Sequence, residues 1–311
     1  MSAIELRGVT KRFGEVAAVR GLDLEVPEGE VFGFLGPNGA GKSTTINLLL
    51  DFVRPTAGSV RVLGRDAREE SVAVRRRTGV LPEGFDVYGR LTGLQHVEFA
   101  IESKEADADP LAVLDRVGLR EAAERRAGGY SKGMRQRLAL GMALVGEPDL
   151  LILDEPSTGL DPAGAREMRE IVREENARGA TVFFSSHILG QVEAVCDRVG
   201  ILRDGELVAE DSVEGLREAV GTESRLRVRV DRVPDGATQA IEAVEGVTRA
   251  RSEGGEFLID CQDSAKTAVL DAIEEAGASV SDFETEEASL EDLFMAYTSD
   301  DPAEAREVPE A

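Results

Sequence analysis

The segment Gly36–Thr44 reads GPNGAGKST and has the residue types and spacing of a phosphate-binding loop. Its glycines let the backbone curl so that successive N–H groups point at phosphate oxygens, and the helix that follows turns its positive dipole end toward the same place. Lys42 can reach the β- and γ-phosphates of a nucleotide, and the Ser43 hydroxyl can ligate Mg²⁺. We therefore expect ATP to be bound by Gly36, Pro37, Asn38, Gly39, Ala40, Gly41, Lys42, Ser43 and Thr44.

A second candidate site follows the apolar run Leu150–Leu153, which leads into the carboxylates Asp154 and Glu155. The carboxyl ends of parallel strands are where such a sheet holds its chemistry, so we expect this pair to face the phosphate loop. Asp154 can hold Mg²⁺ directly or through water, and Glu155 can polarise the attacking water as a general base. Because adjacent residues at a strand end diverge, the two carboxylates are expected to do different work.

The elements that must position these groups can be predicted from the spacing of apolar residues. Residues 4–26 alternate between apolar and polar, which is typical of half-buried antiparallel strands. A helix is predicted around 91–101, where apolar residues recur at helical spacing. Short, continuously apolar runs indicate strands buried on both faces of a mixed, mainly parallel sheet with helices on its faces, and they lie at 31–35, 150–153, 182–184 and 199–202.

The pattern loosens at 211–224, and we predict a first domain over 1–215 and a small second one over 222–298. Residues 225–286 read strand, helix, strand, strand, helix, strand, an order that predicts an α+β ferredoxin-like domain. A last helix is expected from Ser289, the N-cap, to Thr298. The remainder, 299–311, is acidic and is expected to be disordered.

Further segments, in order across residues 3 to about 210, resemble the ABC ATPase family of P-loop NTPases. The first is YSKGMRQR, Tyr130–Arg137, which resembles the signature sequence of that family and stands just before a helix. By this resemblance, Ser131 and Gly133 contact the γ-phosphate that is bound to a partner subunit. Lys132 replaces the first glycine of the usual pair, and we expect its charge to strengthen that contact. The resemblance also implies a helical subdomain that carries this segment.

Two more segments resemble loops of the same family around the γ-phosphate. SSH at Ser185–His187 matches the switch histidine, so that His187 joins Glu155 and Lys42 as an expected catalytic residue. STGLDP at 157–162 resembles the loop that places an aspartate, here Asp161, near the seam of the dimer. The other histidine of the chain, His96, has no such context and is assigned to the surface or to packing.

Two positions stand where the family places the adenine-stacking ring and a metal-sensing glutamine. Phe13 occupies the place of the ring, and stacking requires only a ring face. In VLPEGF, Glu83 replaces the glutamine; its carboxylate can meet Mg²⁺ or water but adds charge near ATP. Residues 83–90 are expected to meet a permease. With SLEDLFMAY at 289–297, these features resemble the drug-resistance subgroup of exporters, of the daunorubicin-resistance type.

The resemblance implies ATP hydrolysis by a head-to-tail dimer, homo- or heteromeric, in which each ATP lies between one phosphate loop and the other subunit's signature. No apolar run reaches about 18 residues, so a separate integral membrane permease is expected as partner. No secretory signal is recognisable, and we expect a cytoplasmic protein at the inner face of the membrane. The alternative is a soluble ABC ATPase acting on ribosomes or DNA, against which stand the single cassette and the lack of a coiled-coil arm.

The composition narrows the setting further. The 311 residues carry a formal net charge of -24, which disfavours nucleic acid as a partner because phosphate backbones require a basic face. Self-repulsion of this size is screened in concentrated salt, so we expect a halophilic host. Two cysteines, Cys196 and Cys261, cannot form a disulfide framework and are expected to be small buried side chains.

Overall fold

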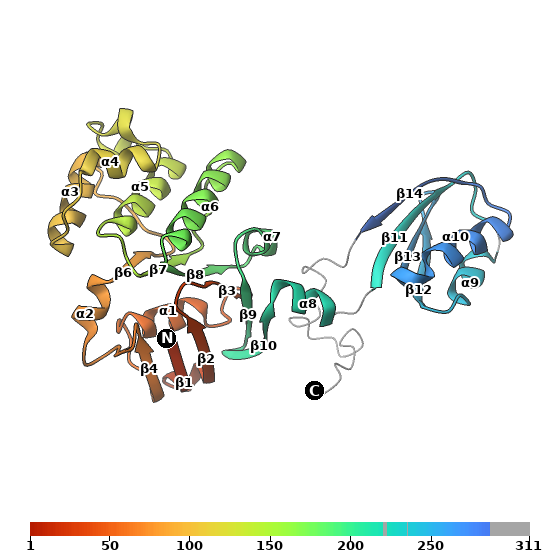
Figure 1. The fold of residues 1–311 in the computed structure, drawn as a ribbon, viewed down its shortest axis with the longest axis horizontal. Helices are drawn as coiled ribbons and strands as arrows, with labels where there is room; N and C mark the ends of the chain where they lie inside the picture. Colours follow the sequence, from red (N-terminus) through yellow and green to blue (C-terminus); the bar gives the residue numbers. More distant parts are fainter. Residues whose placement is uncertain (220–222, 235, 287–311) are drawn as a thin grey trace. The chain divides into compact units, whose positions relative to one another are not determined.

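The computed structural model describes residues 1–219, 223–234 and 236–286, and the chain divides into two compact units, Met1–Val213 and Glu214–Ala311 (Figure 1). Each unit has its own hydrophobic core. The helix and the tail expected after Ser289 lie outside the described residues. Among those that are described, no helix has the length and apolar character needed to cross a lipid bilayer.

The central sheet of the first unit has six strands in the order β10-β9-β3-β8-β7-β6. Its neighbours are parallel from β9 to β6, and only β10 pairs antiparallel at one edge. Every residue of β3, β7 and β8 is buried, as the continuous apolar runs predict. The strands are β3 Val31–Leu35, β6 Thr78–Leu81, β7 Leu150–Asp154, β8 Thr181–Ser186, β9 Arg198–Arg203 and β10 Glu206–Ser212.

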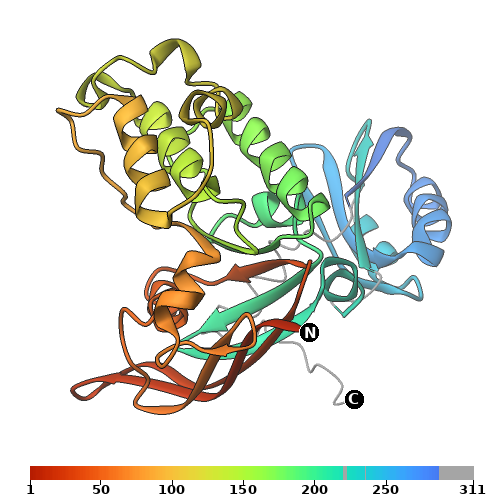
Figure 2. The same cartoon turned by 60° about the vertical axis from the view of Figure 1, so that its left-hand side comes forward.

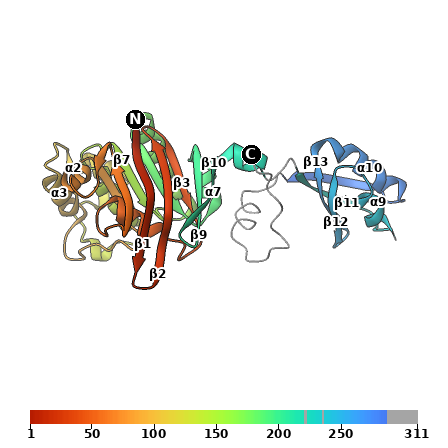
Figure 3. The same cartoon turned by 90° about the horizontal axis from the view of Figure 1, so that it is seen from below.

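A second, antiparallel sheet is built from the N-terminal strands in the order β2-β1-β4-β5. The long β1–β2 hairpin is visible in Figures 1 and 3. Its alternating pattern buries Leu22, Leu24 and Val26, which join Phe32 and Phe34 of β3 in one core. The strands are β1 Ser2–Phe13, β2 Val16–Pro27, β4 Ala57–Val62 and β5 Arg65–Asp66.

The helices of the first unit cover the sheets and form a separate helical layer, α3 to α5 (Figures 1 and 2). The helix expected at 91–101 is α3, which begins with a capping box between Thr92 and Gln95. The helices are α1 Lys42–Leu49, α2 Ser71–Arg76, α3 Gly93–Lys104, α4 Pro110–Arg116, α5 Lys132–Leu144, α6 Pro162–Ala177 and α7 Leu189–Glu193, with 3-10 turns at Arg120–Ala122 and Ala127–Gly129. Helix α8, Val213–Ala219, starts at the boundary and falls in the second unit.

The second unit is a four-stranded antiparallel sheet in the order β12-β13-β11-β14. With a helix after the first and third strands, this is the ferredoxin-like arrangement, and the predicted fold class is confirmed for both units. Its core joins Leu226, Phe257 and Ile259 of the sheet to Ile241 and Ile273 of the helices. The elements are β11 Glu223–Val230, α9 Ala237–Glu242, β12 Val247–Glu253, β13 Glu256–Gln262, a 3-10 turn Asp263–Ala265, α10 Lys266–Glu275 and β14 Val280–Glu286.

Candidate active site

The loop between β3 and α1 is held in a tight curl by two glycines. Gly41 has a left-handed backbone, with φ of 111°, immediately before the first residue of α1. A Cβ on Gly41 would lie 2.5 Å from the carbonyl oxygen of Ala18 in β2, and one on Gly36 would lie 2.5 Å from the carbonyl oxygen of Leu202 in β9. Only glycine fits at either position. The predicted loop therefore packs closely against β2 of one sheet and β9 of the other.

Lys42, the first residue of α1, folds back over this loop. Its side chain is only 6% exposed, and Nζ donates hydrogen bonds to the carbonyl oxygens of Gly36 at 2.6 Å and Pro37 at 3.3 Å. The ammonium group is thus hydrogen-bonded to two loop carbonyls. It can exchange these partners for the phosphate oxygens of a nucleotide. The next residue, Ser43, is exposed at the start of the helix.

Burial lowers the pKa of Lys42, and three nearby carboxylates oppose that shift: Glu155, Asp154 and Glu83, in decreasing order of effect. The structure therefore brings the phosphate-loop lysine and the expected acidic residues within electrostatic reach of one another. Glu83, which the sequence places in a separate loop after β6, is exposed and is one of this group.

The two carboxylates at the end of β7 contact different partners, as expected if they have different roles. Asp154 and Glu155 are 4% and 5% exposed. Asp154 accepts a hydrogen bond from the hydroxyl of Ser185, its neighbour in β8. Glu155 has a positive φ of 49°, which is rare for a residue with a side chain and typical of strained functional positions.

Glu155 turns toward the histidine at the end of β8. Nδ1 of His187 lies 2.8 Å from Oε1 of Glu155, and the Ser186 hydroxyl lies 3.5 Å from the other carboxylate oxygen. The imidazole is 47% exposed whereas the carboxylate is buried. A buried carboxylate oriented by an imidazole at an open edge is suited to activate water as a general base.

The signature segment lies at the start of α5. The Ser131 hydroxyl caps this helix by accepting a hydrogen bond from the Met134 N–H at 3.2 Å. The stem of Lys132 crosses Gly159, where a Cβ would lie 2.5 Å from the lysine Cδ. Among the described residues, no hydrogen bond or ion pair joins Ser131 or Gly133 to the phosphate loop.

The loop that resembles the dimer-seam segment connects several parts of the site. Asp161 caps α6, accepting the Gly164 N–H at 2.7 Å, so its side chain has a structural task in this chain. Sequence reasoning missed two polar contacts of the same loop: the Ser157 hydroxyl bonds to Gln191 of α7, and Gln136 of α5 donates to the Pro156 carbonyl at 3.0 Å. Gln136 lies within the signature segment, so its motif could have singled it out, whereas Gln191 belongs to no recognisable short motif.

Phe13 ends β1 at the tip of the hairpin whose second strand touches the phosphate loop at Ala18. Its ring is 51% exposed, and the Lys11 ammonium lies 4.7 Å from the ring centroid. An exposed ring in this position has a face available for stacking on a base.

The loop after β6 is tied to the helical layer. Asp86 pairs with Arg135 of α5 at 3.7 Å, and the Tyr88 N–H donates to Nε2 of His96 at 3.0 Å. His96 is 2% exposed and its Nδ1 lies 2.7 Å from the Thr92 carbonyl oxygen, so this histidine packs and positions the loop. Both α3 and α5 therefore contact the loop that carries Glu83.

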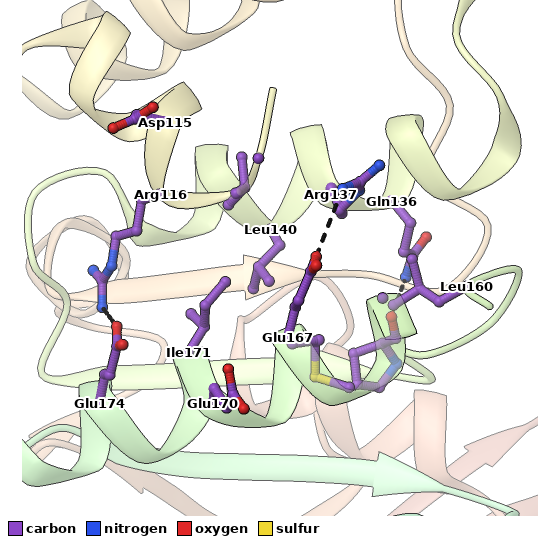
Figure 4. A pocket seen from close by; sticks show the side chains of 15 residues that line it. Asp115, Arg116, Gln136, Arg137, Leu140, Leu160, Glu167, Glu170, Ile171 and Glu174 are labelled. Carbon is purple, nitrogen blue, oxygen red and sulfur yellow. Dashed lines mark hydrogen bonds and ion pairs between the residues drawn. The ribbon is translucent and has the colours of Figure 1, made fainter. Parts of the chain in front are cut away.

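A pocket of 570 Å³ lies between the helical layer and α6, and Gln136 and Pro156 are among the residues that line it (Figure 4). Ion pairs cross it from Arg116 to Glu174 at 3.1 Å and from Arg137 to Glu167 at 3.7 Å. It contains none of the predicted catalytic residues, and it marks the boundary between the two layers of the first unit.

Residues 19–158 match the family model described as ABC transporter, and residues 212–298 match the one described as ATP-binding protein DrrA1-3-like, C-terminal domain. The chain is 39% identical to the fluoroquinolones export ATP-binding protein of Mycobacterium tuberculosis over 298 residues. The matched region covers 95% of this chain and 93% of that relative. The chain belongs to the family of ABC transporter ATP-binding proteins. The resemblance drawn from its motifs is thereby confirmed.

Other similarities of this ABC ATPase agree. It is 35% identical to the daunorubicin/doxorubicin resistance ATP-binding protein of Streptomyces peucetius, over 99% of this chain and 96% of that relative. A solved ATP-binding subunit of an ABC transporter matches with a TM-score of 0.66 at 28% identity, over 71% of this chain and 94% of that one. A dimeric cassette bound to ADP and Pi matches with a TM-score of 0.63 at 27% identity, covering 68% and 98%. These relatives favour transport over the ribosome- or DNA-directed alternative.

Proposed function

We propose that this ABC ATPase hydrolyses Mg-ATP in a head-to-tail dimer and so powers a separate integral membrane permease. The observation that carries the proposal is the arrangement at one sheet edge. Lys42 is buried over the phosphate-binding curl, and Glu155 touches His187 at the ends of adjacent parallel strands. Positioning and charge stabilisation are what phosphoryl transfer requires of a protein.

In the proposed reaction, Glu155 takes a proton from the attacking water while His187 holds its carboxylate in place. The water oxygen bonds to the γ-phosphorus as the bond to the β–γ bridging oxygen breaks, which yields ADP and phosphate. Lys42 leaves the carbonyls of Gly36 and Pro37 for the phosphates and stabilises the charge on the transferred group. Phe13 stacks on the base.

Mg²⁺ is the cofactor that the donor set fits. The exposed Ser43 hydroxyl and the Asp154 carboxylate are hard oxygen donors, and Mg²⁺ in nucleotide sites is held by one or two such groups together with phosphates. When bound, the ion neutralises phosphate charge. Glu83 is a third candidate ligand, since its charge already acts on Lys42.

The dimer explains why the signature stands apart from the phosphate loop of its own chain. We assign Ser131 and Gly133 to the γ-phosphate held by a partner subunit, where the start of the 13-residue helix α5 favours an anion. Lys132 adds a positive charge there, and Asp161 lies at the seam through its capped loop. Closure is then a shift of population driven by ATP.

The permease is proposed to dock on an apolar groove of 290 Å³ between the catalytic sheet and the helical layer. Phe52 and Phe99 on its walls are 63% and 60% exposed, and Phe85 brings in the loop that carries Glu83. A cytoplasmic permease helix that presents apolar side chains would bury both rings. This contact holds the chain at the inner face of the membrane.

The cargo class follows from the relatives. Their names refer to fluoroquinolones export, to daunorubicin/doxorubicin resistance and to linearmycin resistance. We accordingly propose export of drug-like, amphipathic compounds by the complex of this chain with its permease.

The test is Mg-dependent phosphate release from ATP by the purified chain, compared with Glu155→Gln. The variant should still bind ATP and should accumulate as an ATP-bound dimer, with turnover reduced about 10²- to 10⁴-fold, the usual contribution of a general base. Glu28→Gln, an exposed carboxylate outside the site, is the matched control. A Glu155→Gln variant that turns over ATP at the wild-type rate would disprove the assignment.

A further inference from the structure

One face of the C-terminal sheet is covered and the other is open. Both helices, α9 and α10, lie on the same side of the sheet (Figures 1 and 2). The side chains that point to them, such as Leu226, Val228 and Phe257, are fully buried. The alternate side chains point to the opposite face, on which no helix of the described residues packs.

The strand registers arrange the charges of this open face in columns. Arginines point outward from β12 and β11, whereas carboxylates point outward from β14 and, on either side of Leu258, from β13. Across the sheet the columns therefore read positive, negative, positive, negative. They are Arg249 and Arg251 on β12; Glu256 and Asp260 on β13; Arg225, Arg227 and Arg229 on β11; and Asp282 and Glu284 on β14. Glu253, at the end of β12, is the one acid in its column.

The two inner columns pair with each other within the sheet. Arg225 contacts Asp260 at 2.9 Å and Arg229 contacts Glu256 at 2.8 Å. The outer columns differ, because Arg249, Arg251, Asp282 and Glu284 form no ion pair within 4.0 Å with any residue that the structure describes, although the charges of Asp282 and Glu284 act on Arg229 of the neighbouring strand. All four are exposed. The two outer strands are three strand spacings apart, about 14 Å, so the two columns cannot reach each other across one sheet.

We propose that this open face binds the same face of a second copy of the chain, about a twofold axis parallel to the strands. Such a rotation exchanges the two edges of the sheet, so β12 of one copy faces β14 of the other and β13 faces β11. Every positive column then meets a negative one. A twofold axis across the strands would instead place β12 on β12, arginine against arginine. The column order thus selects one isologous arrangement.

The local charge supports a second copy as the occupant. The outward side chains described above comprise five arginines and five carboxylates, in a chain whose net charge is -24. Two copies of so acidic a chain repel each other through their net charge. At this face, in contrast, the charges are balanced and complementary. Polar faces of this kind give orientation more than affinity. In a dimer of the ATPase units, each copy brings its own C-terminal face. The second contact is then intramolecular, and the effective concentration of one face for the other is in the millimolar range of tethered modules.

The test is a charge-swap cycle on the full chain, without nucleotide, with the dissociation constant of the dimer measured by analytical ultracentrifugation. The first variant is Arg249→Glu with Arg251→Glu, the second is Asp282→Arg with Glu284→Arg, and the third combines all four changes. Each double reversal should raise the dissociation constant at least about tenfold, and the combination should return it to within about threefold of wild type. The control, Arg68→Glu with Arg120→Glu, alters the net charge equally at exposed positions of the first unit and should change the constant less.

Because the two outer columns cannot meet within one sheet, rescue in the combined variant can arise only between copies. A wild-type chain that stays monomeric at about 100 μM would overturn the proposal. So would double reversals that weaken the dimer and are not rescued in the combined variant, which is the result expected if the face instead packs on the ATPase unit of the same chain. Neutral pairs, Arg249→Gln with Arg251→Gln and Asp282→Asn with Glu284→Gln, should weaken the dimer less than the reversals, and they preserve the test if a reversal unfolds the domain by circular dichroism. ATP hydrolysis is measured separately, so failure here leaves the proposed function standing.

Discussion

The Nδ1 atom of His187 lies 2.8 Å from the buried carboxylate of Glu155, which itself sits on a left-handed backbone turn. The two residues come from the ends of neighbouring parallel strands, so the sheet fixes their separation. The orientation of the proposed base therefore depends on a side chain that is half open to solvent, and this relationship can be tested directly.

Replacing His187 with alanine should lower kcat by about 10²- to 10³-fold while leaving ATP binding intact, because Glu155 loses its orienting partner but Lys42 and the phosphate loop remain. Phosphate release gives kcat and KM, and a fluorescent nucleotide gives the dissociation constant. His96→Ala is the control, since this histidine packs under the Tyr88 loop. A His187→Ala enzyme with normal kcat would show that the contact is not used in catalysis.

The stem and the charge of Lys132 can be tested separately. Lys132→Met retains the stem that crosses Gly159 and removes the charge, whereas Lys132→Gly removes both. We expect the dissociation constant of the ATP-induced dimer to rise a few-fold in the methionine variant, which loses one charge-assisted contact, and to rise further in the glycine variant. Gly159→Ala should act in the same direction, because the new methyl group displaces the lysine stem. Equal ATP affinity and turnover in all three variants at fixed salt would contradict the assigned role.

Phe99 on the proposed permease groove provides a test of docking. Phe99→Asp should leave ATP hydrolysis by the isolated chain unchanged and should abolish its recruitment to membranes that contain the permease, because a carboxylate would be buried in an apolar contact. Val72 on α2 is 62% exposed and outside the groove, so Val72→Asp is the matched control. Membrane sedimentation measures the effect. Equal recruitment of both variants would place the permease elsewhere.

Glu175 should stabilise the first unit more than its neighbour Glu174 does. Glu175 is 1% exposed and pairs with Arg116 at 2.5 Å and Arg178 at 2.6 Å, whereas Glu174 is 63% exposed and pairs with the same Arg116 at 3.1 Å. We expect Glu175→Gln to lower the free energy of unfolding by about 1–3 kcal/mol, because Arg178 and Arg116 lose their buried carboxylate and Arg116 keeps only the exposed Glu174. Glu174→Gln should cost about 0–1 kcal/mol. Denaturant unfolding of both variants measures the difference, and equal losses would contradict it.

Lys104 should give the stability a dependence on alkaline pH. Burial lowers the pKa of its amine from 10.5 to about 8, so between these values the folded state binds fewer protons than the unfolded state. The free energy of unfolding therefore rises with pH across this window through this group. Lys104→Met removes the contribution, so the wild-type minus variant difference should increase from pH 8 to 10.5. A difference that is flat or falls with pH would show that the amine is not buried in solution.

How far the sequence could predict the structure depended on whether each signal is local. The strands at 31–35 and 150–153 and the phosphate loop were predictable because periodicity and backbone curl are encoded by adjacent residues. Glu175 was not, because an acid on an amphipathic helix reads as a surface residue until Arg116 arrives from another helix. For the same reason the contact between Ser157 and Gln191 required the fold.

The assigned roles of single residues show the same division. Asp161 was predicted from its motif, but its use as the cap of α6 depends on where the helix begins. Glu83 was placed near ATP only by resemblance, and its electrostatic effect on Lys42 follows from the packing of β6 beside β7. The charge columns of the second unit are invisible in sequence, because they depend on the registers between four strands.

The close approach of Gly41 to the carbonyl of Ala18 has a further consequence. A side chain at position 41 would clash with that carbonyl, so the glycine allows the hairpin that carries Phe13 to lie this close to the phosphate loop. The aromatic ring and the phosphate-binding amides therefore lie at a fixed distance from each other. A nucleotide whose linker between the base and the terminal phosphate is longer or shorter would reach one of these two groups and not the other.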